Sequence, residues 1–265
     1  MEKSDKIKML LRSSFLQAGW NYLRYQGFGF GFVMLPYLRK LYKGNNLNMI
    51  FTRYLETFNT NPVMAAYCYG ALAKIETDIR NGKANRMEWT MTKTFLTSSL
   101  ASIGDRLFWD TLRPLSLVLG LLVLMIFQVV YHPGYLEKEM TDLEGLLAAF
   151  VVLVSYNAPV FYAKWKGITL SYKHNKVETF GLLLFDWNGA AKKLKAAGFV
   201  LMVFMISFAV YLTAFAMPFG AEFIIVSAFV LFSVFLSSLA YRFNIPCVYV
   251  YFLVLIVFCT GVFLI

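Results

Sequence analysis

The sequence predicts an all-α integral membrane protein, in which N-terminal amphipathic and re-entrant-type helices precede about five C-terminal membrane spans. The 265 residues are 59% hydrophobic and 18% aromatic, and the mean hydropathy is +0.59, well above that of an ordinary soluble domain. Polar and charged residues concentrate before residue 114, and long uncharged runs follow. We therefore expect a single membrane domain over residues 1–265, with polar-site helices in residues 1–113 and hydrophobic spans in residues 114–265.

The spans are predicted from the stretches between consecutive charged residues. Five stretches are long enough to cross, or nearly cross, a bilayer as helices: residues 114–136, 145–163, 196–221, 223–241 and 243–265. The last three are nearly featureless, and the charged residues Glu222 and Arg242 mark their ends.

The charge pattern predicts the orientation. Most Lys and Arg residues precede the first span or lie in the loop 164–195, whereas the loop after the first span is dominated by Glu137, Glu139, Asp142 and Glu144. Basic loops remain in the cytoplasm. We expect a cytoplasmic N-terminus, a cytoplasmic loop 164–195 and a C-terminus outside. This alternation also explains the net charge of +10 without a nucleic-acid partner.

The first strongly apolar segment is residues 10–42. Gln17, Asn21 and Arg24 follow at helical spacing, so one helix here would carry a single polar stripe. Such a stripe normally faces the protein interior or a water-filled cavity. The alternative is a helix at the membrane interface, with these groups among the headgroups.

A helix over residues 47–58 should end at Asn59-Thr60-Asn61-Pro62, because the residue before a proline is disfavoured in helical geometry. Further helices are expected over residues 63–80 and 86–103. The two amides both donate and accept hydrogen bonds, which suits sugar hydroxyls. Helix capping explains the same residues more simply and is favoured if the turn is considered alone.

The segment that precedes the first span sets several charges against an uncharged run. On a helix, Asp105 and Trp109 share one face, and Arg106 and Asp110 share a neighbouring one. Pro114 suits the first turn of a new helix. A polar site therefore meets the membrane here.

Catalytic and metal-binding patterns are missing from the sequence. His132 and His174 are predicted on opposite sides of the membrane, and neither has metal-ligand spacing to another residue. Cys68, Cys247 and Cys259 have unrelated spacings and are interpreted as apolar packing residues. We expect no cofactor, no metal and no catalytic residue, so chemistry would require another subunit.

Four segments carry a resemblance to a known family. They are residues 14–30 with 35–42, residues 54–62, residues 107–114 preceded by Lys93 and Gly104, and, more weakly, residues 156–167. In this order they resemble the IID membrane component of the mannose/fructose/sorbose-type sugar phosphotransferase system.

The resemblance implies a subunit of a phosphoenolpyruvate-dependent transporter in the bacterial cytoplasmic (inner) membrane. Such a subunit forms the path of a hexose-type sugar together with a IIC membrane subunit, in a trimeric hetero-oligomer. Phosphate is carried on histidines of soluble IIA and IIB components, so no phosphorylated histidine is expected in this chain. By position, the implied substrate-binding residues are Asn59, Asn61, Asp105 and Trp109, with Gln17, Trp20 and Asn21 beside them.

The chain departs from the family pattern near this site. Arg106 replaces a usual proline, Asp110 replaces a glycine, and the segment from Ser98 to Ser102 replaces a glycine-rich one. Arg106 and Asp110 are four residues apart, which suggests a compensating structural ion pair. The departures keep a second interpretation open, a diverged D-like subunit with a non-transporting assembly or regulatory role. An independent secondary transporter ranks last, because the C-terminal spans lack midplane ionisable residues and inverted repeats.

Overall fold

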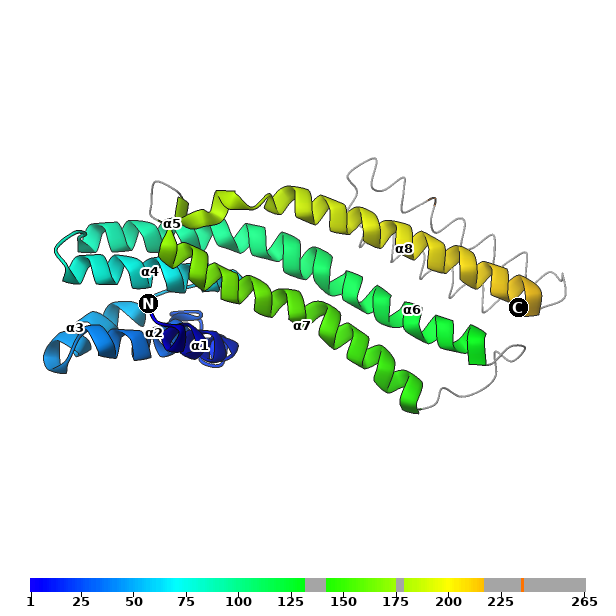
Figure 1. Cartoon of the computed structure of the whole chain (residues 1–265), viewed down its shortest axis with the longest axis horizontal. Helices are drawn as coiled ribbons and strands as arrows, with labels where there is room; N and C mark the ends of the chain where they lie inside the picture. The colour runs from blue at the N-terminus through cyan, green and yellow to red at the C-terminus, as the bar shows by residue number, and fades with distance from the viewer. Residues whose placement is uncertain (132–141, 175–178, 217–234, 236–265) are drawn as a thin grey trace. The chain divides into compact units, whose positions relative to one another are not determined.

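The computed structural model describes residues 1–131, 142–174, 179–216 and 235, and these residues form helices without a β-strand. The chain divides into two compact units, of which the first comprises residues Met1–Met125 and Met140–Gly198 and the second Ile126–Glu139 and Phe199–Ile265. The helices are α1 (Lys3–Arg12), α2 (Gly27–Leu41), α3 (Gly44–Tyr54), α4 (Ala65–Arg80), α5 (Arg86–Gly104), α6 (Arg113–Tyr131), α7 (Asp142–Lys173) and α8 (Trp187–Ala216) (Figure 1).

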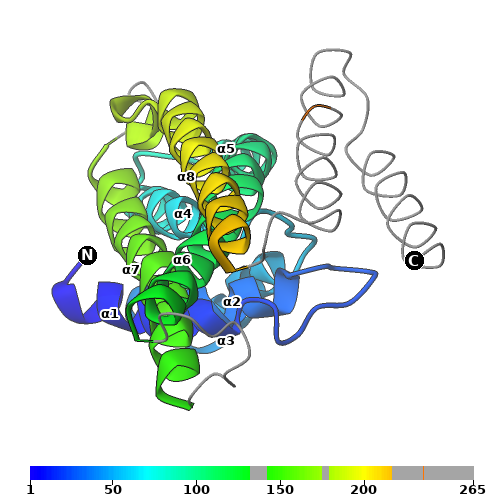
Figure 2. The ribbon, with the colours of Figure 1, turned by 90° about the vertical axis from the view of Figure 1, so that its right-hand side faces the viewer.

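The central helix of the first unit is α4, which lies between α5 and α7 (Figure 2). Its contact with α7 depends on small residues. A Cβ atom at Gly70 would lie 2.4 Å from the carbonyl oxygen of Ile168, and one at Gly167 would lie 2.8 Å from the ring of Tyr67. Helices that carry small residues at the contact can approach to backbone distance.

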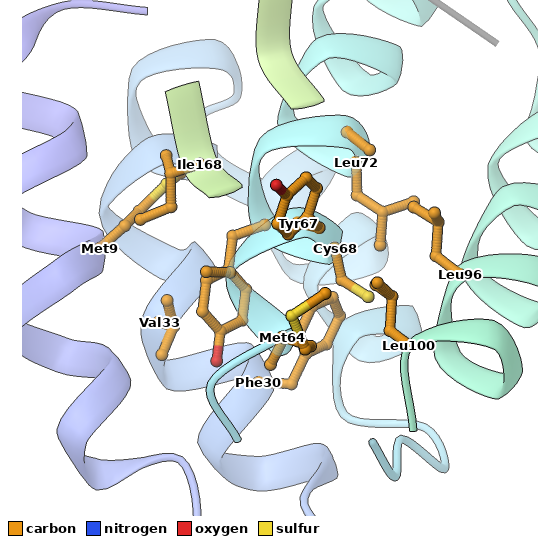
Figure 3. Packing of buried hydrophobic residues seen from close by; sticks show 14 of the residues in the cluster. Met9, Phe30, Val33, Met64, Tyr67, Cys68, Leu72, Leu96, Leu100 and Ile168 are labelled. Atoms are coloured by element: carbon orange, nitrogen blue, oxygen red, sulfur yellow. The ribbon is translucent and has the colours of Figure 1, made fainter. Parts of the chain in front are cut away.

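The core around α4 combines residues from distant parts of the sequence. Figure 3 shows Cys68 and Leu72 of α4 beside Leu96 and Leu100 of α5, all fully buried. On the other side of α4, Phe30 of α2 stacks on Phe58 with ring centroids 4.1 Å apart, which joins α2 to the turn before α4.

Among the described residues, two helices are long and apolar enough to cross a membrane. They cover Arg86–Phe127 and Asp142–Lys173, and they include most of the described part of the first predicted span and all of the second. The third predicted span lies in α8 as far as residue 216. The fourth and fifth lie outside the described residues, apart from the single residue 235, so a total of five spans stays a prediction.

The predicted helix start at Pro114 needs a correction in one respect. Pro114 does lie in the first turn of α6, but the helix before it is not interrupted, because the π-helical turn Asp105–Leu112 connects α5 to α6. The N–H of Arg113 bonds to the carbonyl of Phe108, five residues back. Proline has no N–H to donate, and a wide turn just before it keeps the helix continuous where a regular hydrogen bond is lost.

The helix that would carry the polar stripe of Gln17, Asn21 and Arg24 does not form. After α1 and the short 3-10 helix Ser13–Phe15, the chain is irregular until α2 begins at Gly27. A Cβ atom at Gly29 would lie only 1.9 Å from the carbonyl oxygen of Leu16, so the chain folds back to bring the Leu16 backbone against α2. Gln17, Asn21 and Arg24 consequently do not share a helix face.

Candidate functional site

The Asn59-Thr60-Asn61-Pro62 turn is held in place by Gln26, a buried residue that is not among the predicted site residues. The Gln26 side chain donates to the carbonyl of Thr60 at 2.9 Å and accepts from the N–H of Thr60 at 3.1 Å. The backbone N–H of Gln26 also donates to the carbonyl of Phe58 at 2.8 Å. A side-chain amide thus replaces the backbone partner that this irregular segment lacks. No periodic pattern marks Gln26, so the sequence carried no signal for it.

Asn61 performs two tasks. Its Oδ1 accepts from the backbone N–H groups of Val63 at 3.0 Å and Met64 at 3.4 Å, as a capping side chain does, in the turn that leads into α4 at Ala65. Its Nδ2 donates to Asp105 Oδ1 at 2.9 Å, across 44 positions of sequence. Asn61 is almost fully buried, whereas Asp105 is half-buried. The structure therefore brings two of the predicted site residues into direct contact.

Gly104 makes this contact possible. A Cβ atom on Gly104 would lie 2.3 Å from Cβ and 2.8 Å from Oδ1 of Asn61. Only a residue without a side chain lets the start of the π-helical turn approach Asn61 so closely. The Gly-Asp pair before the first span and the amide-rich turn before α4 consequently form one structural feature.

Asn59 and Trp109 are exposed near this contact in sequence. The Trp109 indole is 44% exposed, on the π-helical turn that begins at Asp105. Asn59 precedes the buried Thr60, and within the described part of the chain its side chain has no hydrogen-bond partner. Both side chains are available to a ligand or a partner.

The structure does not show the expected ion pair between Arg106 and Asp110. Arg106 Nη1 donates instead to Asn188 Oδ1 at 3.0 Å, and no salt bridge joins the two residues among those that the structure describes. Both residues lie in the π-helical turn, where hydrogen bonds connect residues five apart. The four-residue spacing that brings side chains together in an α-helix does not apply there.

Asn21 forms hydrogen bonds within the turn that it begins. It exchanges two backbone hydrogen bonds with Tyr25, at 3.2 and 2.7 Å, and its Oδ1 accepts from the N–H groups of Leu23 and Arg24. Such local bonds compete with helix formation, which is a second reason for the break before α2. Gln17 is exposed in the segment before this turn.

A buried cluster of polar side chains connects α3, α4 and α5 near the site. Arg53 of α3 forms a salt bridge with Glu76 of α4, and the Tyr54 hydroxyl donates to the same carboxylate at 2.7 Å. Trp89 of α5 donates from its indole N–H to the Tyr54 hydroxyl at 3.0 Å. Burial, followed by the Glu76 charge, raises the pKa of Tyr54 well above its usual value, so the phenol remains a donor. Three helices are joined by this cluster next to the amide-rich turn.

Lys93, isolated in the apolar half of α5, is also buried. Its ammonium group lies 3.8 Å from the Glu56 carboxylate and over the ring of Trp89. Within the described residues, no group of three or more His, Cys, Asp or Glu side chains could hold a metal ion. His132, Cys247 and Cys259 lie outside those residues.

Residues 1–129 match the family model of the PTS system mannose/fructose/sorbose family IID component. The matched residues make up a little under half of the chain, and over them the chain is similar to this IID family. It is 37% identical over 123 residues to the mannose-specific EIID component of Escherichia coli (strain K12), covering 45% of this chain and 44% of that protein. The fructose permease IID component of Bacillus subtilis (strain 168) is 35% identical over 122 residues, with the same coverage. The sorbose-specific EIID component of Klebsiella pneumoniae is 30% identical over 174 residues, covering 64% of this chain and 57% of that protein.

The chain thus matches about half the length of these curated IID relatives. Two solved structures have a similar fold. One, described as "Structure of membrane protein", has a TM-score of 0.64 and 26% identity over 77% of this chain and 70% of its own. The other, "CryoEM Structure of Mannose Transporter ManYZ and Microcin E492 (MceA) complex", has a TM-score of 0.56 and 22% identity over 98% of this chain and 96% of its own, which supports the fold alone.

Proposed function

We propose that this protein is a IID-type membrane subunit of a phosphoenolpyruvate-dependent, mannose-type sugar phosphotransferase transporter, and that it forms the sugar path with a C subunit. The observation that carries the proposal is the hydrogen bond from Asn61 to Asp105, because it joins the two segments that the family resemblance implicates in sugar binding. The proposed location is the bacterial inner membrane, with the N-terminus in the cytoplasm and the C-terminus outside.

The proposed sugar site uses the polar groups around this hydrogen bond. Asp105 Oδ1 is occupied by Asn61, and the second carboxylate oxygen can accept from a sugar hydroxyl. The exposed Asn59 amide can donate and accept, and the exposed Trp109 indole can cover an apolar sugar face. Gln17 stays a candidate ligand. We assign Asn21 to positioning, because its amide is already used within its own turn.

The proposed partners follow from this role. They are a IIC membrane subunit, soluble IIA and IIB phosphocarriers, and a hexose-type sugar, in a trimeric hetero-oligomer. Phosphate would reach the sugar from the soluble components, and this chain would supply binding groups and no phosphorylated histidine.

The test is uptake and phosphorylation of a hexose panel in cells without other sugar phosphotransferase membrane components. The chain and its C partner are co-expressed with the soluble carriers. We expect sugar phosphate to form, and its initial rate at low sugar concentration to fall about tenfold in Asn59→Ala, because the lost amide makes up to two hydrogen bonds. Asn46→Ala is the matched control, since Asn46 is an exposed asparagine of α3 far in sequence from the site.

A diverged, non-transporting D-like subunit is the second candidate. The serines near the site favour it, because they add bulk where the family has glycine. The Ser98 hydroxyl donates to the carbonyl of Thr94 at 3.1 Å and the Ser102 hydroxyl to that of Ser99 at 3.3 Å, so both are satisfied within α5. Copurification of the two subunits without any sugar phosphate would favour this candidate.

A further inference from the structure

Three consecutive apolar side chains are exposed before α8. Leu183 and Leu184, at the end of the 3-10 helix Thr179–Leu184, and Phe185, which follows it, are 82%, 64% and 49% exposed. They belong to the first unit. Exposing three adjacent large apolar residues to water is unfavourable, so this run marks a contact surface. We call residues 183–185 the apolar run.

The exposure of the apolar run is built into the fold. Phe180 and Leu182, just before it, are buried, and the backbone at Phe180 and Gly181 is left-handed, with φ of 54° and 75°. The Trp187 indole N–H donates to the carbonyl of Leu182 at 2.9 Å, and this hydrogen bond fixes the C-terminal end of the segment. The buried residues anchor the turn, and the apolar run is consequently held outward.

A cluster of positive charge follows within the first turns of α8. Lys192, Lys193 and Lys195 are exposed, and among the described residues none of them forms a salt bridge. Lys195 is eight residues beyond Trp187, about 12 Å along the helix axis. The next charged residue in the sequence is Glu222, so the lysines stand at the start of a long apolar stretch.

We infer that the apolar run and these three lysines bind anionic phospholipid at the cytoplasmic surface of the membrane. Apolar side chains enter the boundary between headgroups and acyl chains, and lysines directly beside a span reach the negative headgroups. The long lysine side chains extend their ammonium groups to this boundary while their methylenes remain in apolar surroundings. Charge complementarity favours anionic lipid over neutral lipid, and the position just before an apolar stretch favours lipid over a soluble protein.

The first test compares lipid selectivity. The full chain, with any subunit that copurifies, is placed in nanodiscs of phosphatidylcholine with or without phosphatidylglycerol, and bound phosphatidylglycerol is measured by native mass spectrometry. A lysine near an anionic surface strengthens association about fivefold, so the K192Q/K193Q/K195Q variant should lose the preference by up to about a hundredfold. Raised salt should weaken the preference of the unaltered protein.

The matched control is R80Q/K83Q/R86Q, which removes three exposed positive charges from the end of α4, the following turn and the start of α5. This control variant should keep the preference for phosphatidylglycerol. An equal loss of that preference in both variants would show a general charge effect and overturn the assignment to α8. An unchanged preference in the lysine variant would overturn it directly.

The second test identifies the occupant. The photocrosslinker p-benzoyl-phenylalanine is introduced at Leu184, and the adduct formed in native membranes is identified by mass. A phospholipid adduct that falls in the lysine variant supports the inference. An adduct with the C subunit or with a soluble phosphocarrier would overturn it, as would the lack of any adduct in a variant that still assembles. Sugar phosphorylation is measured separately. The crosslinking results can therefore be interpreted even if the proposed transport function fails.

Discussion

Gly104→Ala tests whether the amide-rich turn and the Gly-Asp pair meet as described. The new Cβ would lie 2.3 Å from Asn61 Cβ, where ordinary contact begins at 3.4 Å, so the two groups must separate by about 1.1 Å. Asn61 cannot shift freely, because it is tied to the N–H groups of Val63 and Met64. The separation therefore disrupts its hydrogen bond to Asp105.

The expected cost has three terms. Overpacking costs about 1–3 kcal/mol, and loss of a hydrogen bond to a charged group costs about 1.5–3 kcal/mol. Alanine gains at most about 1 kcal/mol in helix propensity. The net destabilisation is about 2–5 kcal/mol, which lowers Tm by about 4–20 °C at roughly 2–4 °C per kcal/mol for a protein of this size.

The assay is thermal unfolding of the purified complex in detergent, with Gly145→Ala as the matched control. A Cβ at Gly145, in the first turn of α7, meets nothing within 4 Å, so this variant should be as stable as the unaltered protein or slightly more stable. Sugar phosphorylation should fall in Gly104→Ala and persist in Gly145→Ala. Equal stability of the two variants would refute the contact between Gly104 and Asn61.

Three further predictions concern the surroundings of the site. Gln26→Leu leaves the N–H and C=O of Thr60 unpaired and should cost about 2–4 kcal/mol in unfolding free energy and weaken sugar binding, measured by denaturant titration and by the KM for uptake. Glu76→Ala leaves the Arg53 charge buried and should cost about 3–5 kcal/mol, again measured by denaturant titration. Burial and the Glu76 charge raise the pKa of Tyr42 to about 12 from 10.0, so stabilisation from its protonated phenol is complete below pH 10 and lost as pH rises through about 12; ultraviolet titration should show this phase, and Tyr42→Phe should remove it.

Matched variants make these predictions refutable. Asp78→Ala removes a partly exposed carboxylate that pairs with Lys74 and should cost less than about 1 kcal/mol. Similar losses for Asp78→Ala and Glu76→Ala would contradict the role of burial. For the turn, Gln17→Leu changes an exposed glutamine and should leave stability intact, whereas Gln26→Leu should not. A Tyr42 that titrates near 10 would show that its environment is polar.

The sequence by itself determined the features that depend on local composition. Long uncharged runs predicted the first two spans, and the helices predicted over residues 63–80 and 86–103 correspond closely to α4 (Ala65–Arg80) and α5 (Arg86–Gly104). These features follow from backbone propensity, capping residues and hydropathy, which neighbouring residues decide among themselves. The capping role predicted for the amide-rich turn is of the same kind, and Asn61 accepts from the N–H of Val63 in the turn that leads into α4.

Only the tertiary structure decided which distant residues meet. The helix expected to carry Gln17, Asn21 and Arg24 does not form, because the close approach of Leu16 to Gly29 requires the chain to turn back. Arg106 bonds to Asn188, 82 positions away, and the pair of Asn61 and Asp105 spans 44 positions. Periodicity reports the face on which a residue lies and carries no information about the helix opposite that face. The hydrogen bond between Asn61 and Asp105 consequently depends on the packing of the segment before α4 against the end of α5. This close packing requires a glycine at position 104.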